Sequence, residues 1–254
     1  MKIGFYGFGH MATALVTGLL KVGGLCPEEC TVLAKSEQTQ KKARDMGFAV
    51  AESKEALFLQ SELIVLALKP SVFRELSPEL KALDTKENRV VSLMASVGLD
   101  ELKDVFSCPV WRIMPTVAIS KGRDIVGATA PAGFEDLLSR LEKLGQVQIL
   151  EEDGLDALTV AASCGPGFAA KMLYSYQKAC QELGFSKKQA VAITSAVFSF
   201  ASSMEGEDPF LTLEEQVATK GGVTEAGNDA MGQDVKNALD RAFDTALKKT
   251  RPQK

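Results

Sequence analysis

The residues with the clearest chemical meaning lie near the start of the chain, where GFYGFGHMATAL contains the spacing G-x-G-x-x-A from Gly7 to Ala12. The first glycine permits a tight turn, Gly9 lets the backbone approach a ligand closely, and Ala12 permits close packing of a helix on a strand. A short apolar run (2–6) precedes the loop and an apolar helical pattern (11–22) follows it. Because free N–H groups at a helix start attract negative charge, the segment predicts a site for the pyrophosphate of a dinucleotide. A purely structural turn is the alternative.

The same loop contains His10, the only histidine among 254 residues. Histidine is the usual acid or base near neutral pH, but this one stands beside the predicted pyrophosphate site. We therefore expect no role for it in proton transfer. A thiol nucleophile at Cys164 would likewise have no histidine to activate it.

The end of the second predicted strand (31–34) selects between the two nicotinamide dinucleotides. An acidic residue there would bind the ribose 2′-hydroxyl of NAD, but this chain continues with Lys35 and Ser36. A cation and a hydroxyl suit a 2′-phosphate, so the sequence favours NADPH. Glu37 keeps NADH open, and a solvated lysine at a helix start is the alternative for Lys35.

A second glycine pair occurs late in the chain, in KGGVT (220–224). Two glycines before a helix predicted to begin near Glu225 expose N–H groups that could hold a carboxylate. The Thr224 hydroxyl could bond to a substrate, or it could serve as the N-cap of that helix. The two roles are compatible at one residue.

Alternating strand and helix patterns surround the first motifs up to about residue 150. The clearest strand is ELIVLALKP (62–70), a continuous apolar run of the kind that a parallel strand covered on both faces requires. The same pattern recurs in four later segments: RVVSLMA, PVWRIMP, DIVGATA and QVQIL. The alternation predicts an α/β Rossmann-type doubly wound parallel sheet over residues 1–151.

The pattern changes after residue 151. The remaining segment (152–254) contains only helical patterns, and its two long helices between Pro166 and Gly206 are more apolar than an isolated surface helix needs. Such helices are central to a bundle or are buried against another subunit. We predict a second, all-α domain over 152–254.

Composition excludes several classes of protein. The net charge of −4 and the lack of a concentrated basic stripe argue against nucleic acid as a partner. No apolar run approaches the roughly 18 residues of a membrane span, and the glycines and His10 interrupt the apolar N-terminus too early for a signal peptide. Five scattered cysteines predict reduced thiols and a cytoplasmic location. They form no zinc-ligand pattern with a single histidine, so we expect no metal.

The motifs together resemble those of the pyrroline-5-carboxylate reductase family, in order and nearly end to end. The matching segments are GFYGFGHMA, ALKP, VVSLMAS, WRIMPT, EEDGLDALTVAASCGPGFA and EEQVATKGGVTEAG. The last two are similar to the family's E-E-D-x-x-D-A-V-T-x-x-S-G-S-G-P-A and S-P-G-G-x-T and are the most specific. The chain departs from the family at Ser96, Thr116, Ser163, Cys164, Gly167 and Lys220, where the family has glycine, asparagine, glycine, serine, alanine and proline. It resembles a diverged member.

The resemblance implies an enzyme that reduces 1-pyrroline-5-carboxylate to L-proline with NAD(P)H. It implies a Rossmann domain followed by a helical dimerisation domain, and homodimers that can form larger rings. The active site would lie between the nicotinamide and the helical domain, with the partner subunit contributing. An iminium is already electrophilic, so the protein needs to place the carbon, hold the carboxylate and exclude water rather than supply a strong acid.

The resemblance also assigns residues. It implies cofactor binding by Gly7, Phe8, Gly9, His10, Met11, Lys35, Ser36, Ser53, Ala67, Leu68, Lys69, Pro70, Ala95 and Gln216. It further implies that Glu152, Gly222, Val223 and Thr224 bind the substrate and that Thr224 is the catalytic residue. Glu152 is alternatively a solvated acid in a charge run, and Lys69 an ordinary surface lysine.

Two rival hypotheses remain open. The departures at Thr116, Gly167 and Lys220 would suit a reductase of a different cyclic imine. A non-catalytic NADP-binding paralogue is the other rival, although the substrate loop with Gly222 and Thr224 argues against it.

Overall fold

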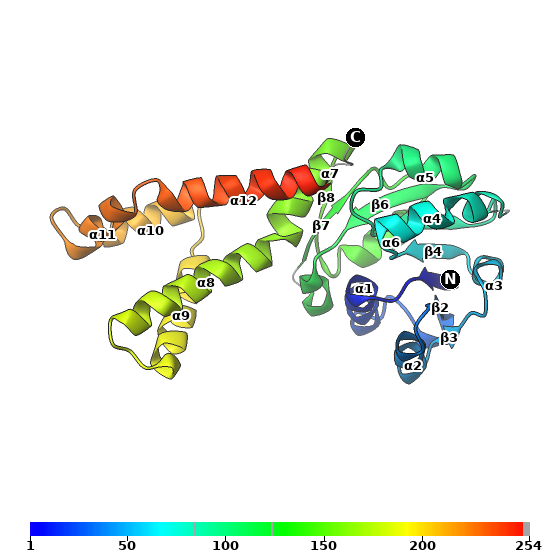
Figure 1. Ribbon diagram of the computed structural model, residues 1–254, viewed down its shortest axis with the longest axis horizontal. Helices are drawn as coiled ribbons and strands as arrows, with labels where there is room; N and C mark the ends of the chain where they lie inside the picture. Colours follow the sequence, from blue (N-terminus) through cyan, green and yellow to red (C-terminus); the bar gives the residue numbers. More distant parts are fainter. Residues whose placement is uncertain (84, 123, 251–254) are drawn as a thin grey trace. The chain divides into compact units, whose positions relative to one another are not determined.

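The computed structural model describes residues 1–83, 85–122 and 124–250. It divides into two compact units: unit 1 comprises Met1–Ser163 with the end of the chain from Leu247, and unit 2 comprises Cys164–Ala246. Figure 1 shows the elements of both, and each unit is described by itself.

Unit 1 contains a sheet of eight strands in the order β3-β2-β1-β4-β5-β6-β7-β8. The first six strands have the order of a doubly wound dinucleotide-binding fold. The strands are β1 (Ile3–Tyr6), β2 (Cys30–Leu33), β3 (Ala49–Val50), β4 (Leu63–Leu66), β5 (Arg89–Ser92), β6 (Val110–Met114), β7 (Asp124–Ala128) and β8 (Gly145–Ile149).

The predicted doubly wound α/β sheet is confirmed, with one difference at the pair β6–β7. These two strands are antiparallel, whereas every other neighbouring pair is parallel. Among the described residues of the connection from Met114 to Asp124, the one regular element is a 3₁₀ helix, Val117–Lys121. A parallel crossover needs a dozen residues or more, so a connection this short reverses the strand.

Helices cover both faces of the sheet (Figure 1). The strands alternate in the side chains they send to each face: Leu63 and Val65 join one core cluster, and Ile64 and Leu66 join the other. The first cluster also contains residues of α1 (His10–Lys21), α2 (Glu37–Asp45) and α6 (Glu135–Leu141). The second contains residues of α3 (Lys54–Gln60), α4 (Pro70–Lys81) and α5 (Leu99–Val105). Burial on both faces is why these strands are continuous apolar runs in the sequence.

The first segment of unit 1, Met1–Ser163, ends with α7 (Glu152–Leu158) and a π-helical turn (Thr159–Ser163). Between residues 164 and 246, all of which are described, the elements are helices, as predicted from residue 152 on. They are α8 (Gly165–Glu182), α9 (Lys187–Ser202), α10 (Pro209–Val217), α11 (Val223–Met231) and α12 (Asp234–Thr250), whose last residues belong to unit 1. No helix in the described part of the chain is long and apolar enough to cross a bilayer.

Unit 2 leaves much apolar surface uncovered. Of its apolar side chains, Cys180 and Ala190 are buried. Many large ones are exposed: Met172, Tyr174, Tyr176, Leu183, Phe185, Val191, Val197, Phe200, Phe210, Leu211, Val217, Val223, Met231, Val235 and Phe243. Exposure on this scale is typical of a surface that another chain covers.

Candidate active site

The glycine loop (residues 7–12) passes between the carboxyl ends of β2 and β4. The Gly7 N–H donates to the Leu33 carbonyl at 2.9 Å, and the φ of Gly7 is +88°. A β-carbon at this position would lie 2.6 Å from the carbonyl oxygen of Ala67. Only glycine therefore fits this turn, for reasons of conformation and of space.

Gly9 differs from Gly7, because the folded chain itself would accept a side chain there. It is the N-cap of α1 with an ordinary φ of −79°, and a β-carbon there would meet no described atom within 4 Å. The first helical hydrogen bond runs from the Thr13 N–H to the Gly9 carbonyl at 3.0 Å. The N–H groups of His10, Met11 and Ala12 therefore have no acceptor within the helix. Open space beside a positive helix end suits an anion such as a pyrophosphate.

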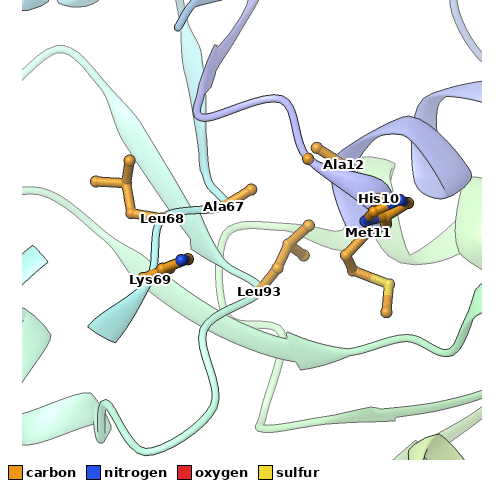
Figure 2. A pocket seen from close by; sticks show the side chains of 8 residues that line it. His10, Met11, Ala12, Ala67, Leu68, Lys69 and Leu93 are labelled. Atoms are coloured by element: carbon orange, nitrogen blue, oxygen red, sulfur yellow. The ribbon is translucent and has the colours of Figure 1, made fainter. Parts of the chain in front are cut away.

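A cavity of about 210 Å³ lies at this helix end, lined by Gly9, His10, Met11, Ala12, Ala67, Leu68, Lys69 and Leu93. Figure 2 shows the helix start on one side, the segment Ala67–Lys69 on the other, and Leu93 between them. These segments follow the carboxyl ends of β1, β4 and β5, where open α/β sheets bind ligands. The structure thus brings together most of the predicted cofactor residues of the glycine loop and of the segment after β4. Leu93 was not among them.

Phe8 lies in the glycine loop, but its ring belongs to the core. The side chain is 3% exposed, and its ring meets those of Phe5 and Phe48 edge to face, each at a centroid distance of 5.7 Å. Only the backbone of Phe8 can therefore face a cofactor. Lys42 covers the ring at 5.9 Å and donates to the Thr13 hydroxyl at 2.9 Å, which places a cation beside the loop that sequence reasoning missed.

The two predicted ribose-side serines both cap helices. The Ser36 hydroxyl accepts from the Thr39 N–H at the start of α2, and the Ser53 hydroxyl accepts from the Ala56 N–H at the start of α3, both at 3.2 Å. A serine hydroxyl that accepts from a backbone N–H keeps its O–H as a donor, which is the group that a phosphate needs. At Ser36 this hydroxyl also shares a hydrogen bond with the Thr39 hydroxyl at 2.7 Å. Lys35 is exposed directly before Ser36. A 2′-phosphate at this helix start would meet a cation and the positive helix end.

One lysine and two glutamates next to Ser53 form ion pairs with one another. Lys54 pairs with Glu79 at 2.7 Å and with Glu55 at 3.2 Å. Hydrogen bonds to Glu79 and Glu55 raise the pKa of Lys54, and burial raises the pKa of Tyr6 at the end of β1. At neutral pH the amine is therefore charged and the phenol is neutral.

The KGGVT segment lies in unit 2 and forms the start of α11. Gly221 has a φ of +72°, and Gly222 is the N-cap. The helix begins at Val223, two residues before the predicted start, so Thr224 lies in the first turn and the N-cap alternative for it is wrong. The carboxylate of Glu225 accepts from the Gly221 N–H at 2.6 Å. The first helical hydrogen bond runs from the Ala226 N–H to the Gly222 carbonyl at 3.2 Å, so the N–H groups of Val223, Thr224 and Glu225 have no acceptor within the helix.

Thr224 lines a cavity of about 430 Å³ within unit 2, whereas Val223 is 93% exposed. Sequence reasoning missed the two polar partners in this cavity, Asn228 and Glu214, which are joined by a hydrogen bond of 3.2 Å. The remaining lining is mainly apolar: Ala201, Phe210, Leu213, Val217, Met231, Gly232 and Val235. Gln216 is exposed and does not line it.

Glu152 begins α7 in unit 1. One carboxylate oxygen pairs with the Nη1 of Arg112, and the other accepts from the Leu99 N–H at 3.2 Å. Glu152 also lines a cavity of about 620 Å³ at the ends of β7 and β8. Arg112 was not predicted as a site residue, although an arginine within the apolar strand VWRIM signals a buried charge that needs a partner.

The structure explains one departure from the family motifs, Thr116, and shows a strained backbone at another, Ser96. The Thr116 hydroxyl donates to Asp124 at 2.6 Å and its N–H donates to the same carboxylate at 2.9 Å, so this buried residue holds the β6–β7 connection. Ser96 has a φ of +61°, the left-handed region that favours glycine. In residues 1–83, 85–122 and 124–250, no group of three or more His, Cys, Asp or Glu side chains could hold a metal.

The strand order, the glycine loop and the open helix start define a Rossmann-type dinucleotide-binding protein. Residues 2–96 match the family model "NADP oxidoreductase coenzyme F420-dependent", and residues 152–252 match "Pyrroline-5-carboxylate reductase dimerisation". The pyrroline-5-carboxylate reductase of Staphylococcus aureus (strain COL) is 30% identical over 244 residues, which are 92% of this chain and 90% of that protein. The chain belongs to the pyrroline-5-carboxylate reductase family.

Solved structures agree with this assignment. The 1-pyrroline-5-carboxylate reductase from Streptococcus pyogenes is 25% identical, with a TM-score of 0.81 and 98% of each chain covered. The Plasmodium falciparum pyrroline carboxylate reductase with NADP bound is 20% identical, with a TM-score of 0.82, and covers 99% of this chain and 97% of its own. The second likeness concerns the fold alone.

Proposed function

We propose that this protein reduces 1-pyrroline-5-carboxylate to L-proline with NADPH, in proline biosynthesis. The observation that carries the proposal is the open N-terminus of α1 at a cavity formed by the ends of β1, β4 and β5, in a chain of this family. Bound NADPH would supply a hydride to the electrophilic carbon of the C=N bond. The chain's own residues bind and orient the two molecules.

The residues present fit a phosphorylated dinucleotide. Gly7–Met11 form the turn around the pyrophosphate, to which His10 and Met11 offer free backbone N–H groups. Lys35 and Ser36 offer a cation and a hydroxyl to the 2′-phosphate. Ser53 is proposed for the adenine ribose, Ala67–Pro70 and Ala95 for the cofactor-facing ends of β4 and β5, and Gln216 for a contact from the helical domain. NADH, for which Glu37 would bind the 2′-hydroxyl, is the second cofactor to test.

The substrate role falls to Gly222, Val223 and Thr224. Their position at the start of α11 supports binding of the substrate carboxylate by first-turn N–H groups. The Thr224 hydroxyl would hold the ring nitrogen or the carboxylate, and the apolar lining around it would exclude water. The resemblance adds Glu152 for the iminium charge, but its contacts with Arg112 and with the Leu99 N–H support a role in holding the chain around the site.

We further propose a homodimer formed through residues 152–252, the segment that matches the dimerisation model, with a functional boundary at 151/152. The exposed apolar side chains of α8 and α9 support this, because a second copy would bury them. Five free thiols support a cytoplasmic location. Light scattering coupled to size-exclusion chromatography measures the mass, and a monomer of 27.2 kDa would contradict the dimer.

The activity test is the decay of NADPH absorbance with 1-pyrroline-5-carboxylate, with its six-membered-ring analogue and without an imine. Turnover of the five-membered ring, with L-proline as product, is the expected result. Turnover of the six-membered ring alone would show that the substrate is the larger cyclic imine, which the departures at Thr116, Gly167 and Lys220 would allow. Binding of NADPH without turnover of either imine would indicate a non-catalytic paralogue.

A further inference from the structure

The loop after β5 (residues 93–98, called loop 93–98) is held from the side of β6 by an ion pair between the buried Arg112 and Glu152, whose side chain is 38% exposed. Arg112 is 2% exposed, and it lies on β6 opposite Ser92, the last residue of β5. Its Nη1 pairs with Glu152, and its Nη2 donates to the Met94 carbonyl at 3.5 Å. The second oxygen of Glu152 accepts from the Leu99 N–H. One carboxylate thus neutralises the arginine and also holds Leu99, the residue that directly follows the loop.

A second arginine holds the same loop from the side of α4. The Nη2 of Arg74, on α4, donates to the Ser96 carbonyl at 2.6 Å. The Nε of Arg74 pairs with Glu101, on α5, at 2.8 Å. Between the two anchors, Ser96 keeps its left-handed φ of +61°, a strained conformation that persists only where the surroundings determine it.

Loop 93–98 has a functional position. Its first residue, Leu93, lines the cavity beside α1 (Figure 2), and Ala95 is a predicted cofactor residue. In a doubly wound sheet each half binds one mononucleotide of the cofactor. The glycine loop and β2 belong to the adenosine half, so loop 93–98, after β5, faces the nicotinamide half.

The ion pair is sensitive to loss of either partner. The Nε of Arg112 is buried and has no acceptor among the residues that the structure describes. Without the Glu152 charge, the buried guanidinium would have to draw water or shift toward solvent. Either change moves the Met94 carbonyl and the Leu99 N–H, which are the two attachments of the loop on this side.

We propose that Glu152 and Arg74 are positioning residues that hold loop 93–98 in the shape that receives the nicotinamide half of the cofactor. Glu152 acts through Arg112 and the Leu99 N–H, not by touching the substrate. The inference rests on the proposed use of NADPH. It predicts that releasing the loop weakens binding of the whole dinucleotide but not of its adenosine half.

The test compares two ligands on the intact protein, NADPH and adenosine 2′,5′-bisphosphate. In Glu152→Gln, which keeps the size and an acceptor but removes the charge, the Kd of NADPH rises about tenfold. The Kd of the bisphosphate stays within about twofold, because its site lies in the other half of the sheet. Arg74→Gln shows the same selective loss, and it decides the question if Glu152→Gln prevents folding, because Arg74 is 43% exposed and does not contact the buried Arg112.

The matched control is Asp136→Asn, which breaks the ion pair with Arg89 (2.7 Å) at the opposite end of β5. It leaves both affinities unchanged. An equal loss of both ligands in Glu152→Gln, or no loss of NADPH affinity, would overturn the inference. An unchanged NADPH affinity with a raised KM for the imine would instead place Glu152 at the substrate. If the wild-type protein bound neither ligand, the proposed function itself would fail.

Discussion

The two glycines of the loop have separable roles, and alanine substitutions distinguish them. Gly7→Ala places a β-carbon 2.6 Å from the Ala67 carbonyl oxygen in a residue with a φ of +88°. Gly9→Ala places one in open space at a φ of −79°. The first change should damage folding, and the second should damage binding of the dinucleotide.

The magnitudes follow from these geometries. A left-handed conformation costs a non-glycine residue about 1–2 kcal/mol, and forcing a methyl group against packed backbone costs about 1–3 kcal/mol more. With roughly 2–4 °C per kcal/mol for a chain of this size, Gly7→Ala lowers Tm by roughly 10 °C. Gly9→Ala costs about 0.5–1 kcal/mol, because alanine is a poorer N-cap than glycine. It lowers Tm by roughly 2 °C.

The binding effect has the opposite order. Pushing the pyrophosphate away from the N–H groups of α1 loses a charge-assisted hydrogen bond of about 1.5–3 kcal/mol. In Gly9→Ala the Kd of NADPH therefore rises by roughly 10- to 100-fold. Thermal unfolding by circular dichroism and fluorescence titration with NADPH measure the two quantities. A Gly9→Ala protein that binds NADPH normally would refute the pyrophosphate assignment and favour a purely structural turn.

Lys35→Glu should abolish the preference for NADPH over NADH, because a carboxylate repels the 2′-phosphate; an unchanged ratio of the two Kd values would contradict the assignment. His10→Asn should retain most of the activity, since only the backbone N–H at this position is needed; a dead enzyme that still binds NADPH would show that the histidine reacts. Thr224→Ala should lower kcat/KM by roughly 10- to 100-fold with NADPH affinity intact, the cost of one hydrogen bond to a charged group; unchanged kinetics would remove its role. Burial raises the pKa of Cys30 to about 12, so iodoacetamide at pH 8.5 should modify the exposed Cys26 and spare Cys30, as mass spectrometry would show.

Local patterns in the sequence predicted most of the fold. Strands buried on both faces are continuous apolar runs, so the main strands of unit 1 were located to within a few residues. The strand Ala49–Val50 was missed, because two residues form no detectable period. The antiparallel pair β6–β7 was missed because strand direction depends on the length of the connection rather than on composition.

The glycine loop was predictable for the same reason as the strands. Its turn, close approach and helix start all lie within six consecutive residues, so each requirement constrains neighbouring side chains. The sequence also predicted that KGGVT precedes a helix, but it did not predict which residue caps that helix. Whether Thr224 or Gly222 caps α11 depends on where the helix begins, which the structure places at Val223.

Contacts between distant segments required the folded chain. Composition and short motifs indicated a dinucleotide site and the family, because a phosphate-binding turn uses residues adjacent in sequence. The partnership of Arg112 with Glu152 has no local pattern: β6 and α7 supply one charge each, and the strand order brings them to the same loop. From the sequence, Glu152 could contact the substrate or be a solvated acid in a charge run. The tertiary structure places it in an ion pair with Arg112, because a buried arginine needs a partner of opposite charge.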